Sequence, residues 1–244
     1  MGRIIAVYSM KGGVGKSSLA VNLAHGMALA GQRSLLWDVD AQGAASFLLG
    51  QDGLDTDGPK ARRIFANKVD AADGIEPTAY AGLDLIAADL SLRHIDRTLG
   101  DGDKPKRLRK LLQALAPQYD RIILDCPPGL GELSDQIFRA AELIVVPLVP
   151  APLALRTLEQ VQAHLVAEHG KNPPRLLPVF SMVDKRKTSH RDLCDSHKDW
   201  PQVPQASVVE RMAVERAPLA VFAGKTAAAK AMAGVLAAVE AVWG

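Results

Sequence analysis

The chain has 244 residues, of which 48% are hydrophobic and 5% aromatic, and its formal net charge is +2 at pH 7. A chain of this length buries roughly 70–75% of its unfolded surface, so neither disulfides nor a structural metal are needed for stability. The two cysteines lack a paired spacing, and there is neither a basic leader with an apolar core nor a run of about 18 apolar residues. We therefore expect one domain over residues 1–244, cytoplasmic and reduced, that does not span a membrane.

A glycine-rich loop at residues 8–18 lies between an apolar strand pattern at residues 3–7 and a helical pattern at residues 17–30. Three glycines let the loop adopt backbone angles that turn its N–H groups toward an anion, and the start of the helix adds positive partial charge. They are Gly12, Gly13 and Gly15. This order of strand, loop and helix is typical of a phosphate-binding loop.

Two side chains at the end of the loop indicate which phosphate ligand it binds. Lys16 can reach the β- and γ-phosphates of a nucleotide, and the hydroxyl of Ser17 suits a position in the coordination sphere of Mg²⁺. The loop therefore predicts a site for a nucleoside triphosphate with magnesium.

The loop departs from the strict Walker A pattern, because Met10 occupies the place of its first glycine and Lys11 follows. In this form it resembles the deviant Walker A ATPases of the ParA/MinD type, whose signature is Lys-Gly-Gly-x-x-Lys-Ser/Thr. The resemblance implies that Lys11 crosses a dimer interface to the partner's phosphates, where it neutralises charge on the transferred phosphoryl group. It also implies that the cofactors are ATP and Mg²⁺ and that the loop contacts are Lys11, Gly12, Gly13, Val14, Gly15, Lys16, Ser17 and Ser18.

The second predicted strand, residues 33–39, ends in the acidic sequence Asp-Val-Asp-Ala-Gln-Gly at residues 38–43. Carboxylates at this end of a parallel strand lie where such sheets bind ligands. The sequence resembles the first switch of the family, Asp-x-Asp-Pro-Gln-Gly, with Ala41 in place of the usual proline. The resemblance implies that Asp40 positions the attacking water and that Asp38 lies near the magnesium.

Residues 50–82 show the weakest patterns, with a short helix predicted at residues 61–66. Residues 67–70 read Asn-Lys-Val-Asp, which matches the guanine-reading motif of GTPases. That motif normally follows the Walker B strand, whereas here it precedes that strand, so no guanine specificity is predicted. A strand at residues 83–87 and a basic amphipathic helix at residues 104–115 follow.

The run at residues 119–128 contains apolar residues that end in Asp125, which describes a Walker B strand whose aspartate holds magnesium through a water. The next four residues, Cys-Pro-Pro-Gly, resemble the second switch of the family. Cys126 could suggest the iron–sulfur chemistry of the related nitrogenase iron protein, but the cysteine spacing favours a small buried thiol.

Three further elements are predicted between residues 143 and 183: an apolar strand at 143–148, a long helix that begins near 150 and ends before 170, and a strand at 175–183. Pro178 indicates an irregular or edge position within the last of these strands. The resemblance places a turn after this strand and a later proline loop beside the adenine, which assigns Met182, Asp184 and Pro204 to the base. Together these elements predict an α/β P-loop NTPase fold, with a predominantly parallel twisted sheet and helices on both faces.

A short helix after residue 187 carries His190, Cys194 and His197 on one stripe. Side chains of these types at this spacing could bind a metal ion. Charged residues surround them in the sequence, so we favour a solvated helix.

The last forty residues include two stretches, 208–211 and 216–219, that resemble the C-terminal part of ParA-type partition ATPases, and a final alanine-rich helix at residues 225–243. Basic residues in this half could contact DNA phosphates, since no aromatic residues interleave for base stacking. A solvated basic face is the alternative. The candidate DNA residues are Lys185, Arg186, Lys187, Arg191, Arg211, Arg216, Lys225 and Lys230.

The resemblance covers nearly the whole chain and implies a ParA-like function. Such a protein dimerises with ATP, coats DNA non-specifically in the nucleoid, and is released when a ParB-like cargo adaptor stimulates hydrolysis, so that a plasmid, chromosome or protein assembly is positioned. A membrane-surface ATPase like MinD is the first alternative, against which we note that no amphipathic tail follows the last helix. A metabolic P-loop ligase or kinase is the second, although no second substrate pocket is evident.

Overall fold

The computed structural model describes residues 2–51, 61–66, 68–100, 106–169 and 173–243. Its strands are β1 (Arg3–Val7), β2 (Ser34–Asp38), β3 (Ile75–Pro77), β4 (Leu83–Ile86), β5 (Arg121–Asp125), β6 (Leu143–Leu148), β7 (Arg175–Val183) and β8 (Gln202–Pro204). They form one sheet in the order β3-β4-β2-β5-β1-β6-β7-β8. Among the strand pairs of the described residues, only β3–β4 is antiparallel, so the predicted predominantly parallel sheet is confirmed.

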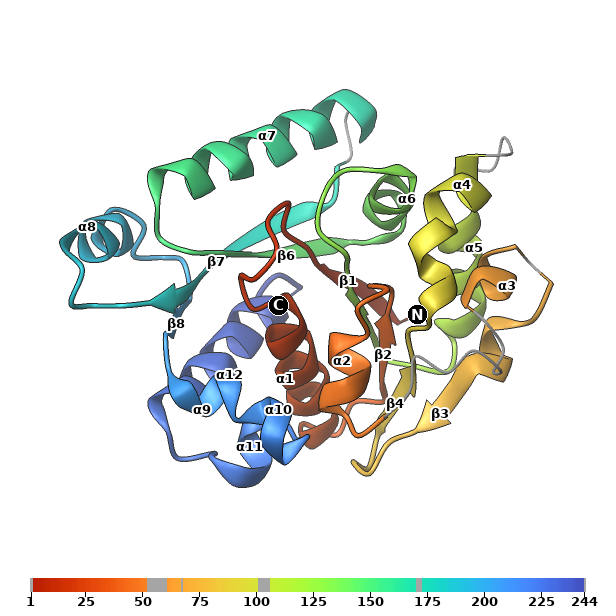
Figure 1. Ribbon diagram of the computed structural model, residues 1–244, viewed down its shortest axis with the longest axis horizontal. Helices are drawn as coiled ribbons and strands as arrows, with labels where there is room; N and C mark the ends of the chain where they lie inside the picture. The colour runs from red at the N-terminus through yellow and green to blue at the C-terminus, as the bar shows by residue number, and fades with distance from the viewer. Residues whose placement is uncertain (1, 52–60, 67, 101–105, 170–172, 244) are drawn as a thin grey trace.

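Helices cover both faces of this sheet (Figure 1). In chain order they are α1 (Lys16–Leu29), α2 (Ala44–Leu48), α3 (Ala61–Phe65), α4 (Ile95–Gly100), α5 (Arg107–Leu115), α6 (Glu132–Ala140), α7 (Pro152–His169), α8 (Thr188–Ser196), α9 (Ser207–Glu210), α10 (Met212–Glu215), α11 (Leu219–Phe222) and α12 (Ala227–Glu240). Two 3-10 turns, η1 (Ala71–Gly74) and η2 (Leu90–His94), lie between α3 and α4.

The core has two layers, because successive side chains of a strand point to opposite faces of the sheet. On β1, Ile4 and Ala6 pack in the layer covered by α3 to α7, and Ile5 and Val7 pack in the layer covered by α1 and α12. These side chains are almost completely buried. Since β1 lies near the middle of the sheet, the loop that follows it is supported from both sides.

Some element boundaries differ from the sequence predictions. The amphipathic helix predicted at residues 104–115 is observed from Arg107, and residues 101–105 lie outside the described part. The last helix is shorter than predicted and begins after Thr226, whose hydroxyl accepts the N–H of Ala229 at 3.3 Å. Pro178 pairs with β6, whereas the pairing with β8 begins only at Phe180, which confirms the edge position predicted for the proline.

The stripe on α8 is a packed face, so our preference for a solvated helix was wrong. His190 and Cys194 are buried, and the Nδ1 of His190 accepts the N–H of Asp184 at 3.1 Å. The ring of His197 lies 4.3 Å from that of Trp200. The described residues contain no group of three or more His, Cys, Asp or Glu side chains that could hold a metal ion. The stripe therefore attaches α8 to the sheet.

Among the helices in the described ranges, none is long and apolar enough to cross a bilayer.

Candidate nucleotide-binding site

The glycine-rich loop connects β1 to α1 at the carboxyl edge of the sheet. Gly13 and Gly15 have φ of +73° and +86°, values that favour glycine over any residue with a side chain. The hydroxyl of Ser181 on β7 donates to the carbonyl of Val14 at 2.8 Å and holds the middle of the loop. Lys16, the first residue of α1, is only 7% exposed. The loop is therefore a shaped and anchored anion cradle.

Two aspartates lie side by side next to this cradle. Asp38 and Asp125 end the adjacent strands β2 and β5 and are paired in register. Asp38 accepts the N–H and the hydroxyl of Ser46, at 2.9 and 2.8 Å, and the N–H of Asp40 at 3.2 Å. Burial nevertheless raises the pKa of Asp38 to about 6. Asp38 is thus a structurally held carboxylate that has lost its hydration.

Within the described ranges, Asp125 differs from Asp38 because no group lies within hydrogen-bonding geometry of its carboxylate oxygens, although the Ser17 hydroxyl is close enough to lower its pKa. Both of its carboxylate oxygens are buried and have no hydrogen-bond partner in the part of the chain that the structure describes. Burial, together with the charge of Asp38, raises the pKa of Asp125 well above its ordinary value, and Ser17 and Lys16 nearby oppose the rise. A divalent cation would satisfy these orphaned oxygens, since magnesium prefers oxygen ligands. The predicted set Ser17, Asp38 and Asp125 is therefore brought together and fits magnesium.

The first switch residue, Asp40, borders the same space. A cavity of about 460 Å³ is lined by the loop glycines, Lys16, Ser17, Asp40 and Pro128, among others. Asp40 is partly exposed, and its Oδ1 accepts the N–H of Gln42 at 3.0 Å. A second cavity of about 220 Å³ separates Asp40 and Ala41 from the second switch at residues 127–131. Asp40 thus lines both the phosphate cavity and the space next to the second switch.

Lys11 differs from Lys16, the other lysine of the loop, in its position. It is exposed, and it does not line the cavity that contains Lys16 and Asp40. Its backbone N–H donates to the hydroxyl of Ser9 at 3.4 Å. Within one chain, Lys11 is therefore available to a neighbouring molecule.

An apolar pocket of about 100 Å³ adjoins the loop and is lined by Gly15, Met182, Val203 and Pro204, among others. Met182 has φ of +54°, an uncommon conformation for a residue with a side chain. Two of the three predicted adenine contacts, Met182 and Pro204, are thus placed beside the loop. Such a pocket suits a flat aromatic base.

Asp184, the third predicted adenine contact, does not line this pocket. Its carboxylate accepts the Nε and Nη2 of Arg186, at 2.8 and 2.9 Å, which lowers its pKa. Val209 and Glu210 line both the apolar pocket and the phosphate cavity instead. From the sequence, residues 208–211 were noted only for their resemblance to ParA-type ATPases, and no contact with the nucleotide was predicted for them.

The structure adds a contact between β1 and the second switch that the sequence did not predict. Tyr8 donates its hydroxyl to the carbonyl of Gly129 at 3.0 Å, and its ring meets that of Phe138 edge-on at 4.8 Å. Gly129 has φ of +91°. The signature that the sequence matches begins at Lys11, so no motif marked Tyr8. Its side chain connects the start of the loop at residues 8–18 to the segment after Asp125.

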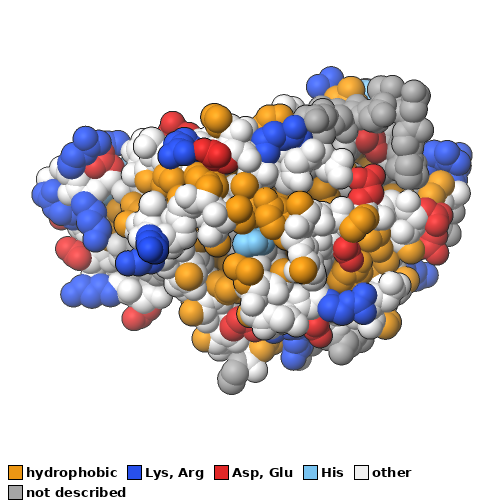
Figure 2. Space-filling view, turned by 90° about the horizontal axis from the view of Figure 1, so that it is seen from below, with side chains coloured by type: hydrophobic (Ala, Val, Ile, Leu, Met, Phe, Trp, Pro, Cys, Tyr) orange, Lys and Arg blue, Asp and Glu red, His pale blue; other side chains and the backbone are white. Residues whose placement is uncertain are grey.

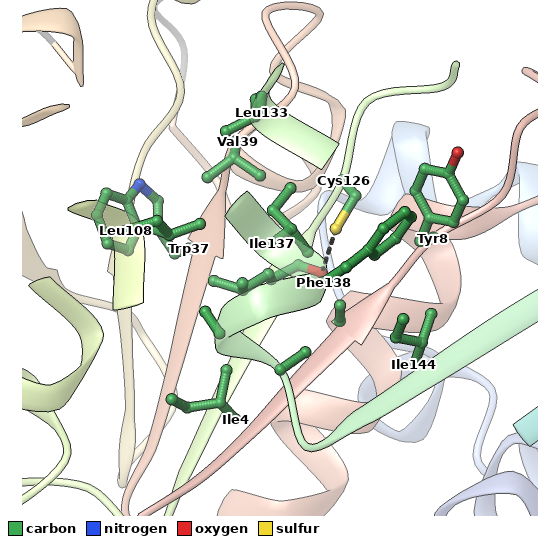
Figure 3. Close-up of a cluster of buried hydrophobic side chains, with 14 of the residues drawn as sticks. Ile4, Tyr8, Trp37, Val39, Leu108, Cys126, Leu133, Ile137, Phe138 and Ile144 are labelled. Carbon is green, nitrogen blue, oxygen red and sulfur yellow. Dashed lines mark hydrogen bonds between the residues drawn. The ribbon is translucent and has the colours of Figure 1, made fainter. Parts of the chain in front are cut away.

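Cys126 lies in the buried cluster between β5 and α6, close to Phe138 and Ile137 (Figure 3). Its thiol is 3.5 Å from the carbonyl of Leu124, and burial raises the pKa of the thiol well above its ordinary value. Cys194 is also a free, buried cysteine. The prediction of a small buried thiol at Cys126 is confirmed.

The candidate DNA residues fall into different environments. Four of them, Lys185, Arg186, Lys187 and Arg191, are exposed around the start of α8, and Lys and Arg side chains gather at that end of the molecule (Figure 2). Lys225 and Lys230 are also exposed, before and within α12.

Arg211 and Arg216 have partners within the chain. Arg211 forms an ion pair with Glu215 at 2.6 Å. Arg216 is half-buried, donates its Nε to the carbonyl of Phe47 at 3.3 Å, and stacks over the Phe47 ring. It also has φ of +49°. These two arginines therefore contribute to local structure, whatever else they bind.

Replacement of Lys16 by alanine is expected to weaken ATP binding at least 100-fold. The buried ammonium is the cation beside the phosphate cradle, and hydrogen bonds to charged groups contribute roughly 1.5–3 kcal/mol each. Fluorescence titration with a labelled ATP analogue measures the effect. Lys68→Ala, which removes an exposed lysine outside the cavity, is the matched control. Affinity within threefold of wild type for Lys16→Ala would contradict this role.

The aspartate pair predicts an unusual pH dependence in magnesium-free protein. Because both pKa values are raised in the folded chain, folding stability is greatest when the carboxyls are protonated and is lost as pH rises through the folded pKa values. For Asp38, a rise from 3.8 to about 6 corresponds to roughly 3 kcal/mol of lost stability at neutral pH.

Asp125→Asn is therefore expected to stabilise the metal-free protein at pH 7.5 by about 1–3 kcal/mol, because the neutral amide removes the buried repulsion. The gain should shrink at pH 5, where the wild-type pair already holds protons. Thermal melts in EDTA at both pH values, with exposed Asp192→Asn as control, measure it. A less stable Asp125→Asn protein at pH 7.5 would show that the pair does not repel as described.

Comparisons with known proteins agree with this geometry. A family model described as "AAA domain" matches residues 2–172. The sporulation initiation inhibitor protein Soj of Bacillus subtilis is 37% identical over 190 residues, which are 76% of this chain and 75% of Soj. The chromosome partitioning protein ParA of Myxococcus xanthus is 37% identical over 192 residues, 76% of this chain and 67% of that protein.

Solved structures share the whole fold. Cobyrinic acid a,c-diamide synthase from Mycobacterium smegmatis, solved with a bound ATP analog and magnesium, superposes with a TM-score of 0.84 at 27% sequence identity. The aligned region covers 100% of this chain and 96% of the synthase chain. A putative plasmid partition protein from Borrelia burgdorferi bound to AMPPNP has a TM-score of 0.83 at 21% identity, covering 99% and 100%. At 21% identity, the similarity to the plasmid partition protein shows a shared fold alone.

Fold and site together define a nucleotide-binding P-loop protein with a deviant Walker A loop. The family match and the curated relatives go further: the chain belongs to the ParA/MinD-like family of P-loop ATPases. The relatives named as partition proteins support a partition or positioning ATPase.

Proposed function

We propose that this chain, as a single ATPase domain, is an ATP-dependent dimerising switch that binds DNA non-specifically and positions a cargo. The observation that carries the proposal is the division of the two loop lysines. Lys16 is buried in the phosphate cradle, whereas Lys11 is exposed outside it. Lys11 does not line the nucleotide cavity of its own chain, so we infer that it acts on the nucleotide bound to a second chain.

In this proposal the loop N–H groups and Lys16 bind the phosphates of ATP, and the base enters the pocket beside Met182 and Pro204. Ser17, Asp38 and Asp125 would hold magnesium, which when bound neutralises phosphate charge. Asp40 orients the attacking water and accepts its proton. The proposed adenine role of Asp184 has no support from the pocket lining.

The partner's Lys11 then completes the site when two chains close on their nucleotides. A cation supplied in trans stabilises the charge that develops on the transferred phosphoryl group. Hydrolysis therefore depends on the dimer, and a ParB-like adaptor on the cargo accelerates it through the switch segments. The contact between Tyr8 and Gly129 gives the second switch a fixed connection to the loop.

DNA binding is assigned to the exposed basic residues around α8, with Lys225 and Lys230 of the C-terminal part as further contacts. Phosphate contacts are sequence-independent and release counterions, so affinity falls with salt by about 0.9 log unit per contacted phosphate for each log unit of salt. In a cell this would place the ATP form on the nucleoid.

The test compares the affinity of the protein for DNA in ATP with its affinity in ADP. Fluorescence anisotropy of a labelled duplex is measured with ATP and with ADP over a series of KCl concentrations. We expect tight, salt-sensitive binding in ATP and at least tenfold weaker binding in ADP. A Lys187→Glu/Arg191→Glu variant should bind the duplex more weakly than wild type in ATP. Equal affinities in ATP and ADP would contradict a DNA switch.

A metabolic ligase is the second candidate, favoured by the 27% identity to the solved cobyrinic acid a,c-diamide synthase over the whole chain. ATP turnover in the presence of cobyrinic acid and an amide-nitrogen donor, compared with turnover in the presence of DNA, distinguishes the two. Stimulation by the small molecules alone would support the ligase. Sedimentation with anionic liposomes in ATP tests a membrane-surface role. Protein that pellets with the liposomes would support that role, and protein that stays in the supernatant would exclude it.

A further inference from the structure

A basic groove lies at the end of the sheet opposite the nucleotide site. Its cavity of about 870 Å³ includes Arg3 and Arg175, the first residues of β1 and β7, and Glu142, which directly precedes β6. Arg109 of α5 and Lys106, which directly precedes that helix, form another part of its wall. The glycine-rich loop follows the other end of β1, so the groove and the loop are separated by the length of the strand.

The groove has an excess of positive charge. Two carboxylates, Glu142 and Glu168, face five cations, which are Arg3, Lys106, Arg109, Arg139 and Arg175. Arg3 pairs with Glu142 at 2.6 Å, whereas Arg139 and Glu168 are 3.5 Å apart. Among the described residues, no carboxylate lies within ion-pair distance of Lys106 or Arg109. Charge in the groove is therefore only partly compensated.

One donor in the groove is buried without an acceptor. The Nε of Arg139, at the C-terminal end of α6, has no hydrogen-bond partner within the described ranges. A buried polar group without a partner costs roughly 1–3 kcal/mol, and an anion in the groove would remove that cost. The unmet donor and the uncompensated cations thus point to the same class of ligand.

Trp243 forms part of the wall of the same groove. The guanidinium groups of Arg3 and Arg121 lie 5.7 and 5.5 Å from the centroid of its ring. Arg121 is itself held by Glu240 through two hydrogen bonds. The ion-paired Arg121 therefore supports the Trp243 ring.

The number of cations and the size of the groove favour a ligand with several phosphates over a single small anion. Four of the five cations are arginines, whose planar forks bind phosphate oxygens in pairs, and the cations line an open cavity of about 870 Å³ that one small anion would not fill. We propose that this groove is a second contact surface for the phosphate backbone of duplex DNA. The inference rests on the proposed DNA binding and adds a location to it.

This location has a consequence for the dimer. Chains that close on each other at their nucleotide sites leave the opposite ends of their sheets outside, so each dimer presents one groove at each end. The grooves therefore contact DNA in addition to the α8 surface, and a dimer can hold duplex at two outer positions.

The test uses Asp40→Ala protein in ATP, which avoids turnover, and a Lys106→Glu/Arg109→Glu variant of it. Anisotropy with a labelled duplex is measured at several KCl concentrations. We expect at least tenfold weaker binding, and a salt slope that is smaller by about 2, since each lost phosphate contact removes about 0.9. Lys68→Glu/Arg156→Glu, two exposed cations outside the groove, carries the same change in charge and should alter affinity less than threefold.

A second variant, Lys106→Gln/Arg109→Gln, guards against a folding defect. It should melt within about 2 °C of its parent and still lose affinity, because both side chains are exposed. Groove variants that bind DNA as the control does would overturn the groove alone. If the parent protein in ATP binds no duplex at all, the proposed function and the groove both fail.

Discussion

Asp40→Ala should bind ATP as tightly as wild type and turn it over at least 100-fold more slowly. The Asp40 carboxylate borders the phosphate cavity, and its one hydrogen bond from the described residues is the N–H of Gln42, so alanine leaves the cradle intact. Loss of a positioned general base typically costs 10²- to 10⁴-fold in rate. Phosphate release under saturating ATP measures the rate, and labelled-nucleotide titration measures the affinity.

Asp192→Ala, which removes an exposed aspartate on α8, is the control for that experiment and should turn over ATP normally. The Asp40→Ala protein should also accumulate as an ATP-bound dimer. Turnover within threefold of wild type would remove Asp40 from the chemistry.

Lys11→Ala should retain ATP affinity within a few-fold but lose about 10³-fold in turnover, the smallest effect expected when a trans cation is removed from a phosphoryl-transfer site. The exposed position of Lys11 outside its own cavity is the structural reason for both halves of this expectation. Normal turnover and dimerisation of the variant would contradict it.

Mixing two inactive variants tests whether the lysine acts between chains. In a mixed dimer, the Lys11→Ala chain keeps its own Asp40 and receives Lys11 from an Asp40→Ala chain. Half of the dimers in an equal mixture are mixed and each has one complete site, so about a quarter of wild-type turnover should return. If the lysine acts within its own chain, the mixture stays inactive.

The sequence was sufficient for the phosphate loop and the parallel α/β fold, because the elements of both are visible as local patterns. The two switches were assigned by resemblance to the family. Glycines at positive φ, apolar strands and aspartates at strand ends are each visible over a few residues. The ends of β2 and β5 were expected at one edge of the sheet, and the structure confirms that Asp38 and Asp125 are neighbours there.

Contacts between distant segments could not be predicted in the same way. Tyr8 and Gly129, or Asp38 and Ser46, meet only after packing has placed their elements, and neither pair has a characteristic spacing. The inward orientation of His190 was missed because charged neighbours in sequence lie on the other side of α8. The basic groove joins residues from both ends of the chain and is visible only in three dimensions.

The central claim is that ATP turns this chain into a DNA-binding dimer. We would test it first by eluting Asp40→Ala protein from a DNA column in ATP and in ADP, while light scattering follows its mass. The account predicts a dimer that is retained in ATP and a protein that flows through in ADP. A monomer in ATP, or equal retention with both nucleotides, would contradict it.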